Sequence, residues 1–457
     1  MKIKNTRFSK YSRSMIEVSI VLIDFLVFFI SWLLLSEYNI INGDRYKTYA
    51  GILIVCLISF IFFNNIYDAY AIGRRKISEN AYSLTLGCLF TNIVFYFLDT
   101  LAFRWFRNPL YAIVATIVQA FTNFYMCKLL NTMYFKSYVP KKALIIYRDK
   151  YDLKKIYDIP FFDNKYKVKK KILNPKSYKS LSKEIANYET IFIAGVNATI
   201  RNGIVKECVK ENVEVYIVPH VGDVIMAGGA YVEELPVPMI RVNRGTMNAY
   251  YILFKRIFDI VVALCATIIL SPFMLITALV IKLYDGGPVL YKQKRLTKDR
   301  KIFTILKFRS MRIDAEKDGV ARLVSEKDDR ITPVGKIIRA IRFDELPQVF
   351  NILKGDMSIV GPRPERPEIA EQYEKIYPSF ALRLQVKAGL TGYAQIYGKY
   401  NTEPIDKLKM DLYYINKMSF LYDIQLCFMT VKTLFMKEST AAIEEGKVTA
   451  SKGRDNE

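Results

Sequence analysis

Two adjacent acidic residues, Asp344 and Glu345, are the side chains of this sequence best placed to do chemistry. An ionised aspartate can act as a nucleophile, and a carboxylate beside it can act as a base. Neighbouring carboxylates repel each other, and a divalent cation such as Mg²⁺ relieves that repulsion while it neutralises a diphosphate. Asp-Glu pairs are also common on solvated surfaces, so the prediction depends on what surrounds this one.

The pair is accompanied by more basic side chains than one short segment needs: Lys307, Arg309, Arg339, Arg342, Arg363 and Arg366. Guanidinium groups bind phosphate oxygens two at a time and stabilise the charge that develops in phosphoryl transfer. Arg363 stands between two prolines, which predicts a stiff loop. We expect a phosphate-binding site here, although half of these cations could instead contact a membrane surface.

A short helix should begin directly after the acidic pair. Pro347 suits the first turn of a helix, and Gly355 suits its C-terminal cap. Leu346 precedes the proline, so we expect it to avoid helical dihedral angles. Asp344 and Glu345 would then stand just before the helix, where free amide groups attract carboxylates and phosphates and keep a carboxylate ionised.

The elements that position these residues include membrane helices. Hydrophobic residues make up 52% of the 457 residues, which is too apolar for a purely soluble protein. Basic residues are frequent at the N-terminus and in the loop with Arg74, Arg75 and Lys76, so both ends of a bundle should face the cytoplasm. Four apolar stretches are each long enough to span a bilayer: Met15 to Leu35, Tyr49 to Tyr67, Ala81 to Phe103 and Pro109 to Phe135.

Charge and composition narrow the remaining chemistry. The net charge of +23 suits nucleic acid, an anionic bilayer or phosphorylated substrates equally well. The six cysteines are scattered with no Cys-x-x-Cys pair, and the chain has one histidine, His220. A disulfide framework, a cysteine metal site and histidine-based catalysis are therefore disfavoured.

A small α/β domain should follow the first four helices. Short β-type runs occur at Ala143 to Tyr147, Thr190 to Ala194 and Val213 to Val218. The first run resembles the opening strand of a nucleotide-binding domain, but Arg148, Asp149 and Lys150 follow it in place of glycines. We expect a structural or regulatory domain.

A fifth apolar segment, Ile257 to Leu283, contains Ser271 and Pro272 near its middle, and many basic residues follow it. Those basic residues should stay cytoplasmic, so both flanks of the segment would lie on one side. Proline breaks a helix, and the serine can satisfy a freed carbonyl. We therefore predict a re-entrant helical hairpin over 255–283. An ordinary kinked span is the alternative, and it would place everything downstream outside the cell.

The chain from about Tyr250 to Phe435 resembles the bacterial sugar transferases, the polyprenyl-phosphate glycosyl-1-phosphate transferases of the monotopic type. Shared motifs include Asp344-Glu345-Leu346-Pro347-Gln348 and Gly361-Pro362-Arg363-Pro364. Further motifs are Lys255-Arg256-Ile257-Phe258-Asp259, Ser271-Pro272, Lys307-Phe308-Arg309-Ser310-Met311, Lys354-Gly355-Asp356-Met357-Ser358 and Gly389-Leu390-Thr391-Gly392-Tyr393-Ala394-Gln395. The whole chain looks like the long form of that family.

This resemblance implies a membrane protein of α plus α/β class. Its parts would be a four-helix bundle at 1–138, a Rossmann-like domain without a dinucleotide fingerprint at 139–248, a mostly helical transferase core at 249–438 and a polar tail at 439–457. We expect it in the bacterial cytoplasmic membrane with its catalytic domain on the cytoplasmic face. The bundle and the middle domain offer surface for a homodimer.

The resemblance also implies roles for residues. Asp344 would attack the diphosphate of a UDP-sugar, expel UMP and form a phosphosugar ester that undecaprenyl phosphate resolves, with Glu345 as base and both carboxylates as Mg²⁺ ligands. Anionic lipids would be further partners, and nucleic acid would not. The break in the re-entrant helix would be Ser271 and Pro272. The substrate phosphates would be held by Lys307, Arg309, Arg339, Arg363 and Arg366.

Three positions depart from the commoner pattern of the family: Ala388, Tyr393 and Arg342. These put the sugar preference in doubt more than the reaction. Two other classes of protein remain as alternatives, a membrane-anchored nucleotide-sugar epimerase or dehydratase and a non-catalytic regulator of polysaccharide export. The first needs a glycine-rich cofactor loop, which is missing after Ala143 to Tyr147.

Overall fold

The structure is a computed structural model that describes residues 4–35, 46–103, 106, 108–232, 237–242, 248–315, 328, 330–398 and 402–434. It divides into two compact units, Met1–Val218 and Pro219–Glu457, and each is considered by itself. The finer division into four segments remains a prediction, and the tail at 439–457 lies outside the described residues.

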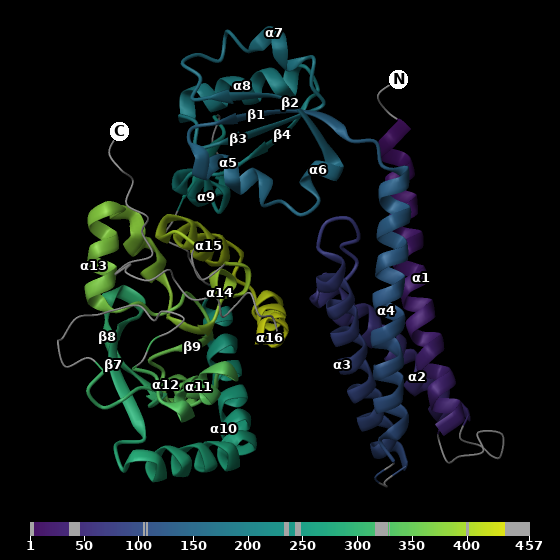
Figure 1. The fold of residues 1–457 in the computed structure, drawn as a ribbon, viewed down its shortest axis with the longest axis vertical. Coiled ribbons are helices and arrows are strands. Elements are labelled where there is room, and N and C mark those ends of the chain that lie inside the picture. The colour runs from purple at the N-terminus through teal and green to yellow at the C-terminus, as the bar shows by residue number, and fades with distance from the viewer. Residues whose placement is uncertain are drawn as a thin grey trace. The chain divides into compact units, whose positions relative to one another are not determined.

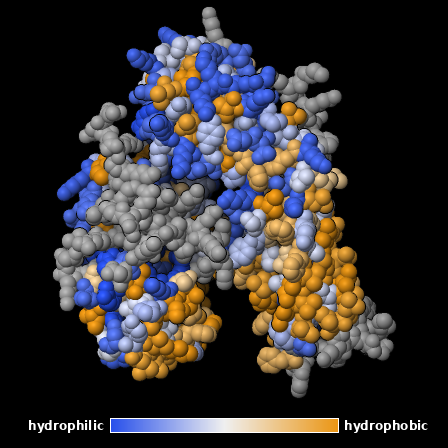
Figure 2. All heavy atoms as spheres, in the orientation of Figure 1, coloured by the Kyte–Doolittle hydropathy of each residue, from blue (hydrophilic) through white to orange (hydrophobic). Residues whose placement is uncertain are grey.

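Four long helices open the first unit (Figure 1): α1 (Lys4–Leu35), α2 (Tyr46–Ile66), α3 (Ile77–Phe103) and α4 (Leu110–Ser137). Each contains a stretch long and apolar enough to cross a membrane, as the sequence predicts. Their shared core is aromatic, with Phe28, Phe60 and Phe95 fully buried. Hydrophobic side chains also cover the outer surface of these helices (Figure 2), which suits contact with lipid.

A four-stranded parallel sheet completes the first unit, with strand order β2-β1-β3-β4. The strands are β1 (Lys141–Tyr147), β2 (Tyr166–Leu173), β3 (Thr190–Ala194) and β4 (Glu214–Ile217), and the helices between them are α5 (Lys150–Tyr157), α6 (Phe162–Lys165), α7 (Ser182–Ile185) and α8 (Ala198–Lys210). The sequence predicted β1, β3 and β4 but missed β2. That strand is an edge strand rich in lysine, and its burial is partial at most, so it lacks the apolar run that marks a buried strand.

The start of α5 explains why this sheet does not look like a dinucleotide site. Asp149 caps the helix by accepting a hydrogen bond from the Asp152 amide at 2.8 Å, and Arg148 pairs with Asp149 at 3.2 Å. A carboxylate therefore occupies the helix end that a pyrophosphate would need. This agrees with the missing glycines of the sequence.

The second unit is mostly helical, with short strands. Its strands are β5 (Ala230–Val232), β6 (Met239–Arg241), β7 (Leu290–Leu296), β8 (Ile302–Phe308), β9 (Ser358–Val360) and β10 (Gly389–Thr391). Its helices are α9 (Val221–Ala227), α10 (Ala249–Asp285), η1 (Lys298–Arg300), α11 (Pro333–Ala340), η2 (Phe343–Glu345), α12 (Gln348–Lys354), α13 (Pro367–Ile376), η3 (Pro378–Gln385), α14 (Tyr393–Tyr397), α15 (Pro404–Lys417) and α16 (Phe420–Leu434). The larger hydrophobic core of this unit includes Met357, Leu408 and Leu426, which are fully buried, and a second, smaller cluster contains Ile281, Phe308 and Ile338.

Helix α10 is the fifth helix that is long and apolar enough to cross a membrane. Its 37 residues include Pro272, and Figure 1 shows that the helix changes direction partway along. Ser271 donates a hydrogen bond to the carbonyl of Ile268 at 2.9 Å. Proline removes a helical hydrogen bond and bends the helix, so α10 has two limbs that meet near this pair.

Both limbs of α10 are fastened to the same unit. On the first limb, Arg256 donates to the carbonyls of Ile352 and Leu353 at the end of α12, each at 2.7 Å. On the second limb, Ile281 packs against Phe308 and Ile338. The two ends of one apolar helix therefore return to one globular unit, as a re-entrant hairpin requires.

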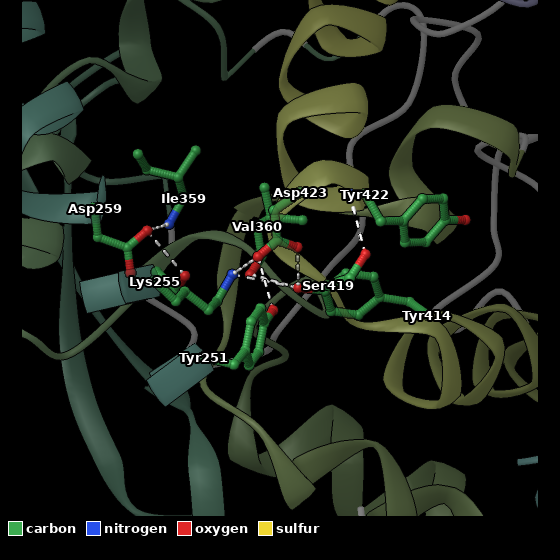
Figure 3. A network of polar contacts seen from close by, with 10 residues as sticks. Tyr251, Lys255, Asp259, Ile359, Val360, Tyr414, Ser419, Tyr422 and Asp423 are labelled. Atoms are coloured by element: carbon green, nitrogen blue, oxygen red, sulfur yellow. Dashed lines mark hydrogen bonds and ion pairs between the residues drawn. The ribbon is translucent and has the colours of Figure 1, made fainter. Parts of the chain in front are cut away.

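A polar network holds the first limb in place (Figure 3). Lys255 pairs with buried Asp423 of α16 at 2.7 Å, and Tyr414 donates to the same carboxylate at 2.8 Å. Asp259 accepts hydrogen bonds from the Ser358 hydroxyl at 3.1 Å and the Ile359 amide at 3.0 Å. The last two contacts attach α10 to β9, the strand that leads into the Arg363 loop.

The prediction that Leu346 avoids helical dihedral angles is wrong. Leu346 has φ −54° and ψ −39°, in the right-handed helical region. Its amide donates to the Phe343 carbonyl, and its own carbonyl accepts from Val349, both at 3.2 Å. The turn of η2 thus continues directly into α12, and this packing outweighs the local bias of a residue before proline.

Gly361 should tolerate no larger residue. A Cβ at this position would lie 2.4 Å from the backbone oxygen of Lys387, and backbone atoms cannot rotate away as a side chain can. We expect Gly361→Ala to lower the thermal unfolding midpoint of the detergent-solubilised protein by at least about 2 °C, because overpacking costs about 1–3 kcal/mol and 1 kcal/mol corresponds to roughly 2–4 °C in a unit of this size. The matched control is Gly222→Ala in α9, where a Cβ would meet nothing within 4 Å. Equal midpoints for the two variants would contradict the expectation.

Candidate active site

The acidic pair lies on a tight turn between two helices. Asp344 and Glu345 form most of η2, which follows α11 and runs into α12. Arg342, just before them, has φ 56°, a left-handed conformation that turns the chain sharply. The side chains of Asp344 and Glu345 are each 14% exposed, so both are partly withdrawn from water and still reachable.

Glu345 is the centre of a cluster of cations. Its Oε1 atom lies 2.9 Å from the Lys307 ammonium and 3.1 Å from the Arg363 guanidinium. Arg342 approaches the other carboxylate oxygen at 4.0 Å. Asp344 is held more loosely, with its Oδ2 atom 4.0 Å from the Lys307 ammonium. Lys307 therefore lies between the two carboxylates and forms its closer ion pair with Glu345.

The two carboxyl groups have opposite pKa shifts. Burial raises the pKa of Asp344, the Lys307 charge opposes this effect, and the neighbouring Glu345 carboxylate adds to it. Burial also acts to raise the pKa of Glu345, but Lys307 and Arg363 outweigh it and hold that pKa well below the usual range. At neutral pH, Glu345 is thus an ionised anchor for the cations, and Asp344 is the more basic carboxylate.

Sequence reasoning assigned the ionisation of this pair to amide groups at the start of a helix. In the structure α12 has only seven residues, and the amides of Val349 and Phe350 already donate to the carbonyls of Leu346 and Pro347. The interactions that hold down the pKa of Glu345 come from Lys307, Arg363 and Arg342. The charge of Glu345 is therefore set by side-chain cations, whereas burial is the largest influence on the pKa of Asp344 and raises it.

Lys307 reaches the pair because strand β8 is bound to α12. The Asn351 side chain accepts a hydrogen bond from the Leu306 amide at 3.0 Å and donates one to the Thr304 carbonyl at 2.8 Å. These two contacts fix the register of β8 against α12. Lys307, the next residue along the strand, is thereby directed to η2.

The Arg363 loop is held by backbone contacts on both sides. The Gly361 amide donates to the Thr391 carbonyl at 2.8 Å, and the Leu296 amide donates to the Glu365 carbonyl at 3.0 Å. Arg295 donates to the Pro364 carbonyl at 3.0 Å. The stiff loop expected from Pro362 and Pro364 is thus also anchored by β7 and β10.

The other predicted phosphate ligands have different surroundings. Arg339 lies close enough to Asp344 to lower the pKa of that carboxyl. Arg366 caps α13, and its Nε atom is 3.9 Å from Glu368. Arg309 is 7% exposed, pairs with Asp285 at the end of α10 and donates to the Pro288 carbonyl at 2.7 Å. Arg309 thus fastens the second limb of α10 to β8, and its role as a phosphate ligand stays a prediction.

Two arginines next to the site were missed by the sequence reasoning: Arg295, which is partly buried, and Arg383, which is buried. Arg383 pairs with Asp411 at 2.8 Å, and both side chains are almost fully buried. One signal could have revealed this pair. Asp411 stands on the apolar face of α15 with the buried residues Leu408, Leu412 and Ile415, at helical spacing, and a charge on such a face needs a partner.

The fold and this site define a class of protein. Its members have helices long and apolar enough to cross a membrane, and a globular unit in which two carboxylates lie among basic side chains. Residues 250–437 match the bacterial sugar transferase family. The chain is 41% identical over 191 residues to the exopolysaccharide production protein PSS of Rhizobium leguminosarum bv. phaseoli, a match that covers 39% of this chain and 94% of the relative. The chain belongs to the bacterial sugar transferase family.

Two longer relatives also match this chain. The UDP-N-acetylgalactosamine-undecaprenyl-phosphate N-acetylgalactosaminephosphotransferase of Aeromonas hydrophila is 42% identical over 187 residues, which are 40% of this chain and 44% of the relative. The UDP-glucose:undecaprenyl-phosphate glucose-1-phosphate transferase of Klebsiella pneumoniae is 38% identical over 208 residues, again 44% of each chain. These matches span less than half the length of both relatives.

The depressed pKa of Glu345 predicts how stability depends on pH. A carboxyl with a depressed folded pKa contributes stability that is present above its unfolded pKa and is lost as the pH falls through the folded value. Below the ordinary value of 4.5, the wild type should therefore lose thermal stability steeply, and Glu345→Gln should lose it less steeply. Unfolding midpoints measured from pH 7 downward test this, with the exposed Glu371→Gln as control. Identical slopes for wild type and Glu345→Gln would refute the assignment.

Proposed function

We propose that this protein transfers a sugar-1-phosphate from a UDP-sugar to undecaprenyl phosphate, with UMP and undecaprenyl-diphosphate-sugar as products. The observation that carries the proposal is the carboxylate pair, in which Glu345 binds Lys307 and Arg363 while Asp344 remains beside them. The names of the relatives support the substrate classes, since they specify UDP-sugars and undecaprenyl phosphate. Such a transfer would be the first membrane step in making an exopolysaccharide or capsule.

Asp344 is the nucleophile of the proposed reaction. One of its carboxylate oxygens attacks the phosphorus that bears the sugar, and the bond from that phosphorus to the bridging oxygen breaks. The electron pair of that bond leaves with UMP, and a phosphosugar ester of Asp344 remains. A phosphate oxygen of the lipid then attacks the same phosphorus and restores the free carboxylate. Two displacements suit two substrates that need not be bound together.

The cations around the acidic pair can bind the diphosphate and stabilise the leaving group. Lys307 and Arg363 converge on Glu345, and Arg339 lies near Asp344. A diphosphate bound beside these groups would exchange carboxylate contacts for phosphate contacts with fork-shaped guanidinium donors. The charge that builds on the departing UMP is stabilised by the same groups.

A Mg²⁺ ion fits the donor set of this site. Among the described residues no group of three or more acidic, histidine or cysteine side chains could form a metal site of its own. Mg²⁺ is commonly held by one or two carboxylates together with substrate phosphates, and Asp344 with Glu345 can supply the carboxylates. When bound, the ion would neutralise charge on the diphosphate.

The proposed membrane placement is multi-pass through α1 to α4, with a monotopic catalytic core whose α10 is re-entrant on the cytoplasmic face of the bacterial inner membrane. Figure 2 shows hydrophobic residues at the end of the second unit where α10 bends. The attachment of both limbs to one unit and the basic residues that follow α10 support this placement. The site would then lie near the level of the lipid phosphates, and anionic lipids would contact the basic residues.

Asp344→Asn should abolish turnover. We expect UMP release from UDP-sugars, screened in the presence of undecaprenyl phosphate, to fall by at least about 1000-fold, because an amide oxygen is a far weaker nucleophile than a carboxylate. The exposed Asp314→Asn is the matched control and should leave the rate unchanged. Without the lipid, a labelled UDP-sugar should leave label on the wild type and none on Asp344→Asn. A non-catalytic regulator would release no UMP with any UDP-sugar, and an epimerase or dehydratase would change the sugar without releasing UMP.

The acid limb of the pH profile should respond to Lys307. The nucleophile must be ionised, so UMP release falls as the pH drops through the pKa of Asp344. Lys307 lowers that pKa, so Lys307→Gln should raise it and move the acid limb to higher pH. The exposed Lys336→Gln in α11 should leave the limb in place. An acid limb that stays put, or moves to lower pH, in Lys307→Gln would exclude Asp344 as the titrating group.

A further inference from the structure

We propose that Arg383 is a positioning residue for the transfer reaction: it holds the backbone of Arg363 so that the guanidinium of Arg363 meets Glu345 and the substrate phosphates. This inference rests on the proposed function. It assigns a role to a side chain that carries no substrate contact of its own.

The central contact runs from one arginine to the backbone of another. The Nη2 atom of Arg383 donates to the Arg363 carbonyl at 2.9 Å, and the Arg363 side chain reaches the Glu345 carboxylate at 3.1 Å. Arg363 is therefore held through its backbone carbonyl by Arg383, while its side chain binds Glu345. A shift of the carbonyl would move the guanidinium with it.

Arg383 is itself fixed in three ways. Its side chain is 3% exposed and lies 2.8 Å from Asp411 of α15, whose side chain is 2% exposed. It also contacts Glu365 at 3.4 Å, and its guanidinium carbon lies 5.0 Å from the centre of the Phe380 ring. Few alternative rotamers are open to a side chain with these contacts, so Arg383 offers the Arg363 carbonyl a rigid donor.

The free-energy cost of burying the ion pair of Arg383 and Asp411 indicates a role other than stability. A buried ion pair seldom stabilises a protein more than apolar side chains of the same volume would, because both charges lose their hydration. Apolar residues at 383 and 411 would meet the buried side chains of Leu408, Leu412 and Phe380, although Glu365 would lose its ion pair with Arg383. What apolar residues cannot do is donate to the Arg363 carbonyl. We therefore assign the pair to the geometry of the loop more than to stability.

Arg383 differs in this respect from the other supports of the loop. Arg295 and the Leu296 amide bind the carbonyls of Pro364 and Glu365, which follow Arg363. Gly361, which precedes Arg363, donates its amide hydrogen to the Thr391 carbonyl. Arg383 donates a hydrogen bond to the carbonyl of Arg363 itself, so this contact acts at the base of the side chain that binds Glu345.

A double-mutant cycle with Arg363 tests the inference. UMP release is measured for the full chain in detergent or nanodiscs with the UDP-sugar and undecaprenyl phosphate that the wild type accepts. We expect Arg383→Gln to lower kcat/KM at least about 10-fold when Arg363 is present, because misplacing one charged ligand costs roughly 1.4 kcal/mol or more. In the Arg363→Ala background, Arg383→Gln should change the rate less than about 2-fold, because the residue it positions is gone.

Controls separate this role from a general effect on folding. Arg383→Lys keeps the charge opposite Asp411, and the same cycle is repeated with it if Arg383→Gln lowers the unfolding midpoint. Arg300→Gln, at an exposed arginine paired with Glu374, should leave the rate unchanged in both backgrounds. If Arg383→Gln or Arg383→Lys lowers activity equally with and without Arg363, or leaves wild-type activity intact, the inference is overturned while the proposed function stands. If the wild type releases no UMP from any UDP-sugar, both fail.

Discussion

The carboxylate of Glu345 is the contact on which the catalytic unit depends. Three segments far apart in the sequence meet there: strand β8 through Lys307, the turn η2, and the loop after β9 through Arg363. Each segment is carried by a different part of the fold, since β8 is bound to α12 through Asn351 and β9 is bound to α10 through Asp259. One anionic group thus gathers cations that would otherwise repel each other.

The same contact explains why two adjacent carboxylates behave differently. Glu345 takes the direct contacts with Lys307 and Arg363, whereas Asp344 is partly buried and its Oδ2 atom lies 4.0 Å from the Lys307 ammonium. Their pKa values are therefore driven apart, and such a separation is a common way for a site to assign different tasks to chemically similar groups. In the proposed reaction the strongly paired carboxylate organises the cations, and the more basic one is left to react.

The sequence predicted what depends on local pattern. The five apolar helices, three strands of the parallel sheet, the cap at Gly355 and the position of the acidic pair all follow from hydrophobic runs and from glycine and proline. Strand β2 and Leu346 did not follow, because one is defined by its place at a sheet edge and the other by continuous packing into α12. Arg309 and Arg383 show the same limit, since a basic residue looks alike in sequence whether it meets a ligand or a buried acid such as Asp285 or Asp411.

The attachment of both limbs of α10 to one globular unit has a consequence for how substrates meet. In the proposed placement, the globular unit is attached to both limbs of the bent helix α10. It could not move deeper into the bilayer or away from it without breaking contacts such as those of Arg256 with the end of α12. In the proposed membrane placement, the height of the reactive turn above the lipid would then be a fixed dimension of the fold. The proposed lipid acceptor would reach the site by diffusion within the membrane plane with its head group already at the right level, and only the proposed soluble donor would have to diffuse in three dimensions.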